Sequence, residues 1–268
     1  MVVTKLNRID EIFKQLRATK RSALMPYLMA GYPDIEASLS LLISVAEAGA
    51  DLIEFGIPYS DPLADGPTIQ AASEVALTTG VNTDIAFDLV KKAREKIETP
   101  IAVMTYYNAI YRYGLERFAG NAAESGVDGV ICPDLPPEEA SPWSGAAAQY
   151  GLANIMFAAP TSTNERLKKI AHMSRGFIYC VSLTGVTGAR TNLPSNLTDF
   201  IGRVRKVTDK PLAVGFGISQ PEQAKQVADI ADGVIIGSAL VSLIGADRET
   251  CTDAAAAYIS KIREAMDS

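Results

Sequence analysis

The sequence predicts an α/β fold: a closed (β/α)8 TIM barrel with an extra N-terminal helix. Short apolar segments recur eight times along the chain, and amphipathic stretches with helical spacing separate them. Some of these segments, such as VDGVIC and ADGVIIG, are nearly continuous apolar runs, which is typical of parallel strands buried on both faces. The chain has 268 residues, and one such barrel takes about 250. We therefore expect a single domain over residues 1–268.

The extra helix is expected within the first twenty residues. Leu6, Ile9, Ile12, Phe13 and Leu16 have the spacing of one helix face, and charges run through the whole segment, unlike a signal peptide. The strands are then expected at Ala23–Met29, Leu52–Gly56, Ile101–Thr105, Gly129–Ile131, Ala153–Phe157, Phe177–Val181, Leu212–Val214 and Gly233–Ile236. The intervening helices are expected at Ile35–Glu47, Thr83–Ile97, Glu138–Tyr150, Asn164–Met173, Asn196–Val207 and Pro221–Ile230, with further helices opening near Thr68 and at Gly237–Ser238.

A doubly wound open sheet is the structural alternative. Such a sheet usually carries a glycine-rich loop directly after its first strand. The corresponding segment here, ALMPYLMAGYPD, contains no GxGxxG motif. The number and spacing of the strands therefore favour the barrel.

The charge balance argues against nucleic acid and membrane partners. The chain carries 25 basic and 31 acidic residues, a net charge of −6, which would repel a phosphate backbone or an anionic lipid surface. Its longest uncharged run, residues 140–164, contains two prolines and many polar side chains, so it is not expected to span a bilayer.

The scarce residues restrict the chemistry further. The single histidine, His172, lies within a helical pattern, where we expect a structural or solvated role. The cysteines Cys132, Cys180 and Cys251 form no CxxC pair, so neither a disulfide framework nor a metal cluster is expected, and a reducing cytoplasm fits best. Proton chemistry is therefore left mainly to carboxylates, tyrosine or lysine.

The second expected strand carries a lone carboxylate. Alternation places Glu54 on the same face as Leu52 and Gly56. If this face points into the barrel, the low dielectric would raise the pKa of Glu54 toward neutrality, which suits a group that both gives and takes a proton. The alternatives are a solvated strand end or a pairing of Glu54 with a buried lysine or arginine.

The segment that follows, Pro58–Pro67, contains three prolines and the carboxylates Asp61 and Asp65. Ten residues exceed the length of a simple βα connection, so the composition indicates an active-site loop. The alternative is that both aspartates only cap local turns.

The last two strand ends indicate a phosphate site. Gly215–Ser219 follows the seventh strand, and Gly237–Ser238 opens a helix after the eighth. Glycine amides and a helix N-terminus bind anions, and barrel enzymes often hold phosphate between these two loops. The sixth loop, Leu183–Asn192, is rich in Gly and Thr and is either a lid over substrate or a flexible connection.

These motifs together resemble the tryptophan synthase α subunit family over essentially the whole chain. The resemblance rests mainly on the segment 54–70, EFGIPYSDPLADGPTIQ. It extends to Pro26, Gly31, Tyr106, Asn108, Pro133–Pro136, Gly185–Gly188 and Gly215–Ser219. The resemblance implies retro-aldol cleavage of indole-3-glycerol phosphate to indole and glyceraldehyde 3-phosphate in tryptophan biosynthesis.

The resemblance also implies roles for individual residues. Glu54 would be the general acid and base, and Asp65 would accept a hydrogen bond from the indole N–H. Thr187 would meet Asp65 when the lid closes. The remaining substrate contacts would come from Tyr27, Met104, Tyr106, Ile131, Phe157, Tyr179 and Phe216, and the phosphate contacts from Gly188, Gly217, Gly237 and Ser238. Two positions depart from the commoner pattern: Tyr27 stands where Phe is frequent, and Leu183 where some members carry Arg.

A partner and the absence of a cofactor are implied in the same way. The family needs neither metal nor organic cofactor in this subunit, and it passes indole to a β subunit that carries pyridoxal phosphate, in an α2β2 assembly. Contacts with the β subunit are expected at Pro58–Pro62 and Asp134–Pro136. A stand-alone indole-releasing lyase, a non-catalytic barrel that activates a partner, and another phosphate-binding barrel lyase or isomerase are the alternatives.

Overall fold

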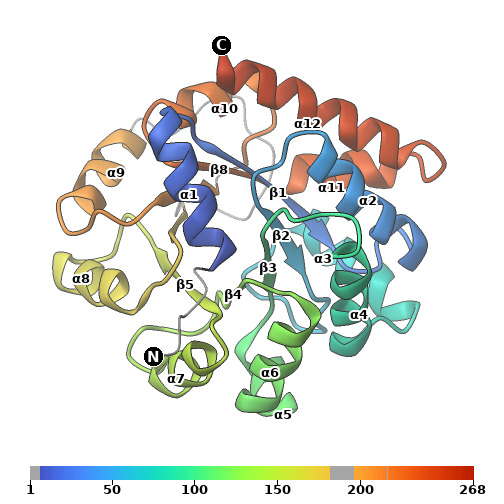
Figure 1. The fold of residues 1–268 in the computed structure, drawn as a ribbon, viewed down its shortest axis with the longest axis horizontal. Helices are drawn as coiled ribbons and strands as arrows, with labels where there is room; N and C mark the ends of the chain where they lie inside the picture. The colour runs from blue at the N-terminus through green and yellow to red at the C-terminus, as the bar shows by residue number, and fades with distance from the viewer. Residues whose placement is uncertain (1–6, 182–195, 216) are drawn as a thin grey trace.

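The eight predicted strands form a closed, all-parallel barrel in a computed structural model that describes residues 7–181, 196–215 and 217–268 (Figure 1). Each strand pairs with its neighbours in chain order, and β8 pairs with β1. The strands are β1 (Ala23–Met29), β2 (Ile53–Gly56), β3 (Ile101–Met104), β4 (Gly129–Ile131), β5 (Ala153–Ala158), β6 (Ile178–Val181), β7 (Leu212–Gly215) and β8 (Gly233–Ile236). The predicted barrel is therefore confirmed, and the open sheet is excluded.

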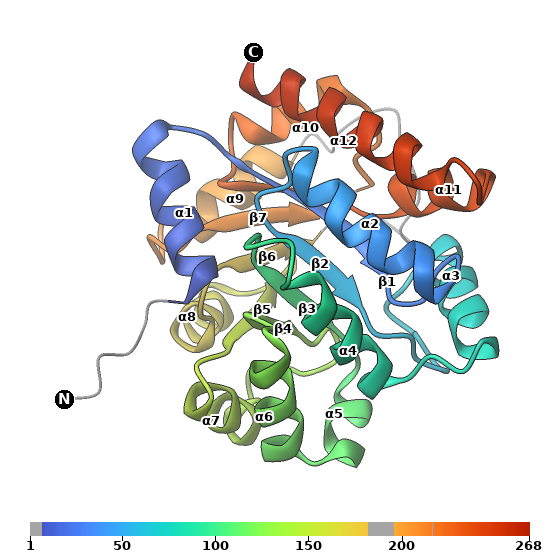
Figure 2. The same ribbon diagram turned by 45° about the vertical axis from the view of Figure 1, so that its right-hand side comes forward.

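Helices surround the strands on the outside (Figures 1 and 2). In the described residues they are α1 (Arg8–Thr19), α2 (Ile35–Glu47), α3 (Pro67–Thr78), α4 (Thr83–Ala93), α5 (Tyr107–Tyr113), α6 (Leu115–Ser125), α7 (Ser141–Gln149), α8 (Asn164–Met173), α9 (Leu197–Arg205), α10 (Pro221–Ala228), α11 (Ser238–Ala246) and α12 (Cys251–Asp267). No helix in these residues is both long enough and apolar enough to cross a bilayer.

The sequence patterns miss three of these helices: α5, α6 and α12. The α5 helix has only seven residues, and it meets α6 at Gly114, whose φ of +94° interrupts the helical path. The α12 helix contains four consecutive alanines, which favour helix strongly but give little contrast between its faces. Most predicted boundaries differ from the observed ones by a few residues. For example, α7 begins at Ser141 rather than Glu138, with Pro142 in its first turn.

Two apolar clusters form the core, one inside the barrel and one between the strands and the outer helices. The inner cluster includes Met25 of β1, Ile155 of β5 and Leu52, the residue just before β2. The predicted N-terminal helix lies across one end of the barrel (Figure 1) and buries Ile9 and Phe13 against this cluster. The α1 helix therefore closes the barrel end opposite the carboxyl ends of the strands.

A repeated aspartate fixes the N-terminal ends of the strands. Shortly before β2, β4 and β8, the side chain of an aspartate accepts a hydrogen bond from the main-chain N–H of a residue at the start of a neighbouring strand. The main-chain N–H of the aspartate donates to the carbonyl of the same residue. The three pairs are Asp51 with Leu24, Asp128 with Ile101 and Asp232 with Leu212, with N···O distances of 2.8–2.9 Å. Each aspartate also pairs with an arginine: Arg263, Arg94 and Arg205 respectively. Asp128 additionally binds Arg8 of α1.

These ion pairs compensate a cost of burial. Burial raises the pKa of Asp128 despite the opposing effect of Arg94 and Arg8, and it lowers the pKa of Arg94. A buried pair of this kind contributes little against an apolar replacement of both partners, but removing one partner leaves the other charge uncompensated. The pairing therefore specifies the geometry more than it adds net stability.

For Asp128→Ala we expect the free energy of unfolding to fall by about 3–5 kcal/mol, because Arg94 would keep its burial and lose its carboxylate. Urea unfolding followed by the fluorescence of the single tryptophan, Trp143, measures this loss. The control is Glu98→Ala, at an exposed partner of Arg8, which should change stability by less than about 0.5 kcal/mol. Equal stabilities of the two variants would contradict the argument.

Candidate active site

Glu54 projects from β2 toward the barrel interior. Leu52, two residues earlier on the same face, belongs to the inner cluster, whereas Ile53, Phe55 and Ile57 belong to the outer one. Glu54 is only 1% exposed. The face that carries Leu52 and Glu54 therefore points into the barrel, and Glu54 is not a solvated strand end.

The surroundings of Glu54 keep it protonated near neutral pH. Among the described residues no lysine or arginine forms an ion pair with it, so the predicted alternative of a buried ion pair is not observed there. Burial, followed by the nearby charge of Asp65, raises the pKa of Glu54 to about 8. The Tyr179 hydroxyl, 3.4 Å from Oε2 of Glu54, donates a hydrogen bond that opposes this rise.

Asp65 is the second buried carboxyl of the site. It lies in the loop between β2 and α3 and is 9% exposed. The Tyr106 hydroxyl donates to its Oδ2 at 3.1 Å and accepts from the main-chain N–H of Ala64 at 3.0 Å. Burial raises the pKa of Asp65 to about 6, and the bond from Tyr106 limits the rise. At neutral pH, Asp65 is therefore mostly ionised beside a protonated Glu54.

The two aspartates of this loop do different things. The exposed Asp61 accepts a hydrogen bond from the hydroxyl of its neighbour Ser60 at 2.7 Å, which is a local turn contact. Asp65 instead bonds a tyrosine that follows the third strand, 41 residues along the chain. Local capping therefore describes Asp61 only.

Aromatic rings surround Glu54 on its barrel layer. Tyr27 of β1 pairs in register with Glu54, and Phe157 of β5 pairs with Tyr179 of β6. The rings of Phe157 and Tyr179 stack with their centroids 4.6 Å apart. Burial and the two nearby carboxylates raise the pKa values of Tyr27 and Tyr179 well above 10, so both hydroxyls keep their protons. Tyr27, which stands where Phe is frequent in the family, thus keeps an aromatic ring at a position predicted for substrate contact.

Two glycines, whose purpose the sequence patterns do not reveal, make room for these tyrosines. A Cβ on Gly56 would lie 2.0 Å from the Tyr27 hydroxyl, and a Cβ on Gly215 would lie 2.5 Å from the Tyr179 hydroxyl. Both glycines end their strands, where glycine is common in turns, so only the structure shows what they accommodate.

Three of the four predicted phosphate residues, Gly217, Gly237 and Ser238, follow the ends of β7 and β8, and the fourth, Gly188, lies outside the described residues. The two strands are adjacent, and Gly215 pairs with Ile235, so Gly217 and Gly237 each come two residues after this pair. Gly217 has a φ of +65°, and Gly237 precedes α11, whose first turn has no side-chain cap. The α10 helix differs, because a capping box between Gln220 and Gln223 closes its N-terminus, and the Gln223 side chain accepts from the N–H groups of Ser219 and Gln220 just before the helix. The α11 N-terminus is therefore the better placed of the two for an anion.

The remaining predicted residues divide into two groups. Met104 and Ile131 lie on the barrel interior, as substrate contacts there require. Four positions lie outside the described residues: Thr187, Gly188, Phe216 and Leu183, the position where some members carry Arg. His172 is exposed on α8, as expected for a solvated residue, and no group of three or more potential metal ligands occurs in the described part of the chain.

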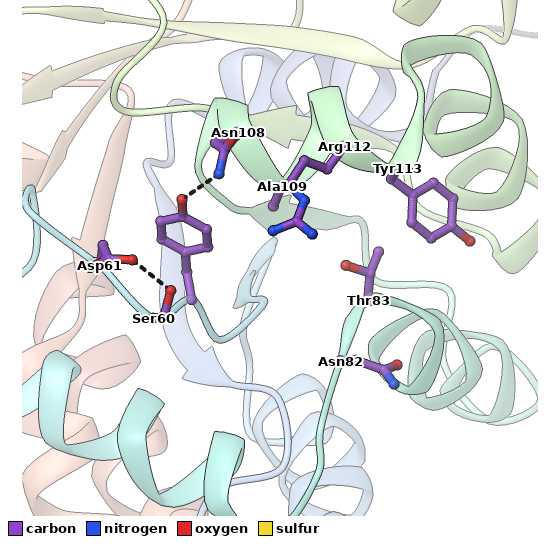
Figure 3. Close-up of a pocket in the computed structure, with 9 residues that line it drawn as sticks. Ser60, Asp61, Asn82, Thr83, Asn108, Ala109, Arg112 and Tyr113 are labelled. Carbon is purple, nitrogen blue, oxygen red and sulfur yellow. Dashed lines mark hydrogen bonds between the residues drawn. The ribbon is translucent and has the colours of Figure 1, made fainter.

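A pocket of about 550 Å³ lies beside the β2–α3 loop, and neither Glu54 nor Asp65 lines it. Side chains from the β2–α3 loop, the start of α4 and α5 converge on it (Figure 3). We call it the flank pocket; its lining residues are Tyr59, Ser60, Asp61, Asn82, Thr83, Asn108, Ala109, Arg112 and Tyr113. Tyr59 connects it to the catalytic side, because its ring stacks on Tyr106 at 5.0 Å while its hydroxyl accepts from Asn108.

Comparisons with known proteins agree on one family. The model of the family described as "Tryptophan synthase alpha chain" matches residues 13–267. The tryptophan synthase alpha chain of Dehalococcoides mccartyi is 48% identical over 98% of this chain and 100% of its own length. A Mycobacterium tuberculosis tryptophan synthase structure matches with a TM-score of 0.91 and 40% identity, covering 98% of this chain and 99% of that one. The Legionella pneumophila alpha subunit structure matches with a TM-score of 0.92 and 39% identity over the same shares.

The family model, the sequence relatives and the solved structures thus agree over nearly the whole chain that carries these buried carboxyls and tyrosines. The chain belongs to the tryptophan synthase alpha chain family.

Proposed function

We propose that this chain cleaves indole-3-glycerol phosphate to indole and glyceraldehyde 3-phosphate, with Glu54 and Asp65 as its catalytic residues. The observation that carries the proposal is the pair of buried carboxyls with separated pKa values, about 8 for Glu54 and about 6 for Asp65. Such a separation gives one acid and one anion at the same pH, which is the arrangement that two-carboxyl catalysis requires.

The reaction needs two proton transfers and no redox step. The Glu54 carboxyl protonates carbon C3 of the indole ring, which leaves a positive charge delocalised onto the ring nitrogen. The resulting carboxylate takes the proton of the side-chain hydroxyl next to the ring. As that oxygen becomes the aldehyde oxygen, the bond to C3 breaks and its electrons restore the neutral indole. Glu54 is then protonated again, ready for the next substrate.

Asp65 stabilises the intermediate of this sequence. Its carboxylate would accept a hydrogen bond from the indole N–H, which becomes more acidic when the ring is protonated. Because Asp65 is buried and already held by Tyr106, it needs little rearrangement when the charge develops. The interaction is therefore stronger in the transition state than in the ground state, as catalysis requires.

The rest of the substrate fits the surrounding surfaces. The rings of Tyr27, Phe157 and Tyr179 would contact the indole, together with the inward-facing Met104 and Ile131. The phosphate would bind the main chain of Gly217 and Gly237 and the start of α11 at Ser238, a buried residue. With these contacts, C3 of the indole would lie near Glu54 and the phosphate beyond the ends of β7 and β8.

We further propose that the chain uses no cofactor of its own and works with a β subunit carrying pyridoxal phosphate in an α2β2 assembly. The carboxyls suffice for the proton transfers. Leu63, next to the expected contact segment Pro58–Pro62, is 92% exposed and Tyr111 on α5 is 66% exposed, so both are accessible to a partner. A partner seated there would contact Tyr59, and through Tyr106 it would influence Asp65.

The proposal also includes a cellular location and a domain organisation. The buried free cysteines Cys132, Cys180 and Cys251 fit a reducing compartment, and we place the enzyme in the cytoplasm as one domain over residues 1–268.

For Glu54→Gln we expect indole release from indole-3-glycerol phosphate to fall by about 10²- to 10⁴-fold, because the amide can neither donate nor accept the transferred proton. Glycerol 3-phosphate should still bind with nearly unchanged affinity, since the proposed phosphate contacts follow β7 and β8 and do not include Glu54. Glu98→Gln, at an exposed glutamate, is the control and should retain full activity. Near-normal indole release by the Glu54 variant would reject the assignment and favour a different phosphate-binding barrel reaction.

For Asp65→Asn we expect kcat to fall by about 10²- to 10³-fold with a much smaller change in KM, because the lost charge acts mainly in the transition state. Steady-state kinetics of indole release separate the two parameters. A variant in which only KM changed would show instead that Asp65 serves ground-state binding.

The pH dependence of kcat/KM should be bell-shaped between limbs near pH 6 and pH 8. Activity rises through the lower limb as Asp65 loses its proton, and it falls through the upper limb as Glu54 loses the proton it must donate. In Asp65→Asn the lower limb should disappear, and the upper limb should move to lower pH because the Asp65 charge helps to raise the Glu54 pKa. A wild-type profile that is flat from pH 5 to 9 would contradict these assignments.

A further inference from the structure

Tyr258 on α12 reaches the loop that carries Gly217. Its hydroxyl donates a hydrogen bond to the main-chain carbonyl of Ser219 at 2.9 Å, across 39 residues of sequence. The side chain is partly buried against the outer core. The contact lies two residues beyond Gly217, on the segment between the end of β7 and the start of α10.

The same peptide unit is held from its other side. The Gln223 side-chain oxygen accepts from the N–H of Gln220 at 3.1 Å and from the N–H of Ser219 at 3.0 Å. The Ser219 carbonyl and the Gln220 N–H belong to one planar peptide group. Tyr258 and Gln223 therefore fix both ends of that plane, and Ile218, which is 1% exposed, anchors the chain just before it.

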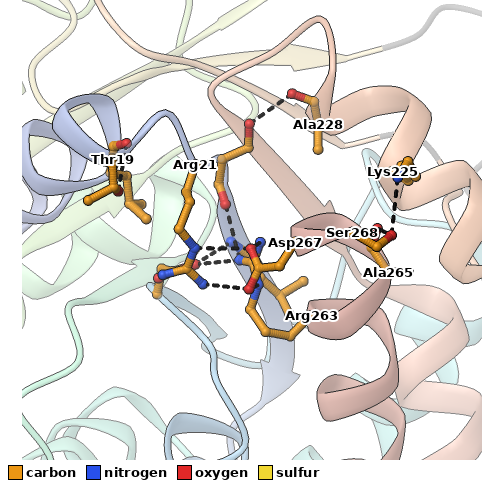
Figure 4. A network of polar contacts seen from close by, with 12 residues as sticks. Thr19, Arg21, Lys225, Ala228, Arg263, Ala265, Asp267 and Ser268 are labelled. Carbon is orange, nitrogen blue, oxygen red and sulfur yellow. Dashed lines mark hydrogen bonds and ion pairs between the residues drawn. The ribbon is translucent and has the colours of Figure 1, made fainter.

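The helix that carries Tyr258 is itself tied to the opposite end of the barrel. Arg263, one and a half turns further along α12, pairs with Asp51 before β2 and donates to the carbonyl of Ser22. Asp267 accepts from both Arg263 and Arg21 near the C-terminus (Figure 4). The α12 helix also packs against α2, α10 and α11, so Tyr258 is presented from a rigid support.

We infer that Tyr258 is a positioning residue for phosphate binding: it holds the Ser219 peptide so that the main chain at Gly217 faces the anion. This inference rests on the proposed function, which places the phosphate of the substrate at Gly217, Gly237 and Ser238. Main-chain N–H groups bind phosphate only when neighbouring carbonyls are turned away, because a carbonyl oxygen repels the anion. The Tyr258 hydroxyl supplies a partner for the Ser219 carbonyl, two residues after Gly217 on the α10 side.

The test is Tyr258→Phe in the full-length chain, which removes one hydroxyl and keeps the packing of the ring. We expect the inhibition constant of glycerol 3-phosphate and the KM for indole-3-glycerol phosphate to rise about three- to tenfold, the range that follows from the loss of one hydrogen bond. Indole inhibition and kcat should stay within about twofold of wild type, because Tyr258 does not contact the indole site.

Tyr113→Phe is the matched control. Tyr113 is also a tyrosine on a helix whose hydroxyl donates a hydrogen bond, to Asp84, but it lies on the flank pocket rather than near β7. It should leave glycerol 3-phosphate inhibition unchanged, and urea unfolding of both variants shows whether any stability loss is comparable.

Three results would overturn the inference. An unchanged glycerol 3-phosphate inhibition constant in Tyr258→Phe would show that the loop holds its geometry without this contact. Equal weakening of indole and glycerol 3-phosphate inhibition would indicate a general structural defect. A wild-type chain that neither releases indole nor responds to glycerol 3-phosphate would contradict the proposed function itself, and with it the role of Tyr258.

Discussion

Closure of the barrel is the constraint on which the other features depend. Because β8 pairs with β1, the inner face of every strand is removed from water, and the one carboxyl on the inner face of β2 is removed with it. The raised pKa of Glu54 follows from this burial before any specific contact is considered.

Contacts at the mouth of the barrel give the two buried carboxyls different surroundings. Asp65 enters from a loop rather than a strand, and Tyr106 holds it in place. Tyr27 and Tyr179 fill the space above the strands that Gly56 and Gly215 leave open. Each carboxyl thus has a different tyrosine as hydrogen-bond donor, Tyr179 for Glu54 and Tyr106 for Asp65, and their different degrees of burial separate their pKa values.

The two ends of the barrel divide stability from chemistry. At the N-terminal ends of the strands, Asp51, Asp128 and Asp232 pair with arginines and main-chain amides, and α1 covers the opening. At the carboxyl ends lie the carboxyls and glycines of the site. The α12 helix contacts both, with Arg263 at the first end and Tyr258 at the second, so one of the three helices that the sequence patterns miss joins the two ends.

The sequence by itself determined the barrel, the shared face of Leu52 and Glu54 and the long loop after them, because apolar periodicity, strand alternation and a ten-residue Pro-rich segment are all local signals. The direction in which that face points was decided by closure of the barrel. Only the tertiary structure decided which groups meet. The bond of Tyr106 to Asp65, the tyrosines above Gly56 and Gly215, and the contact of Tyr258 with Ser219 join residues that are far apart in the chain. Local patterns carry no information about such contacts, because they depend on strand register and on where the closed barrel brings each side chain.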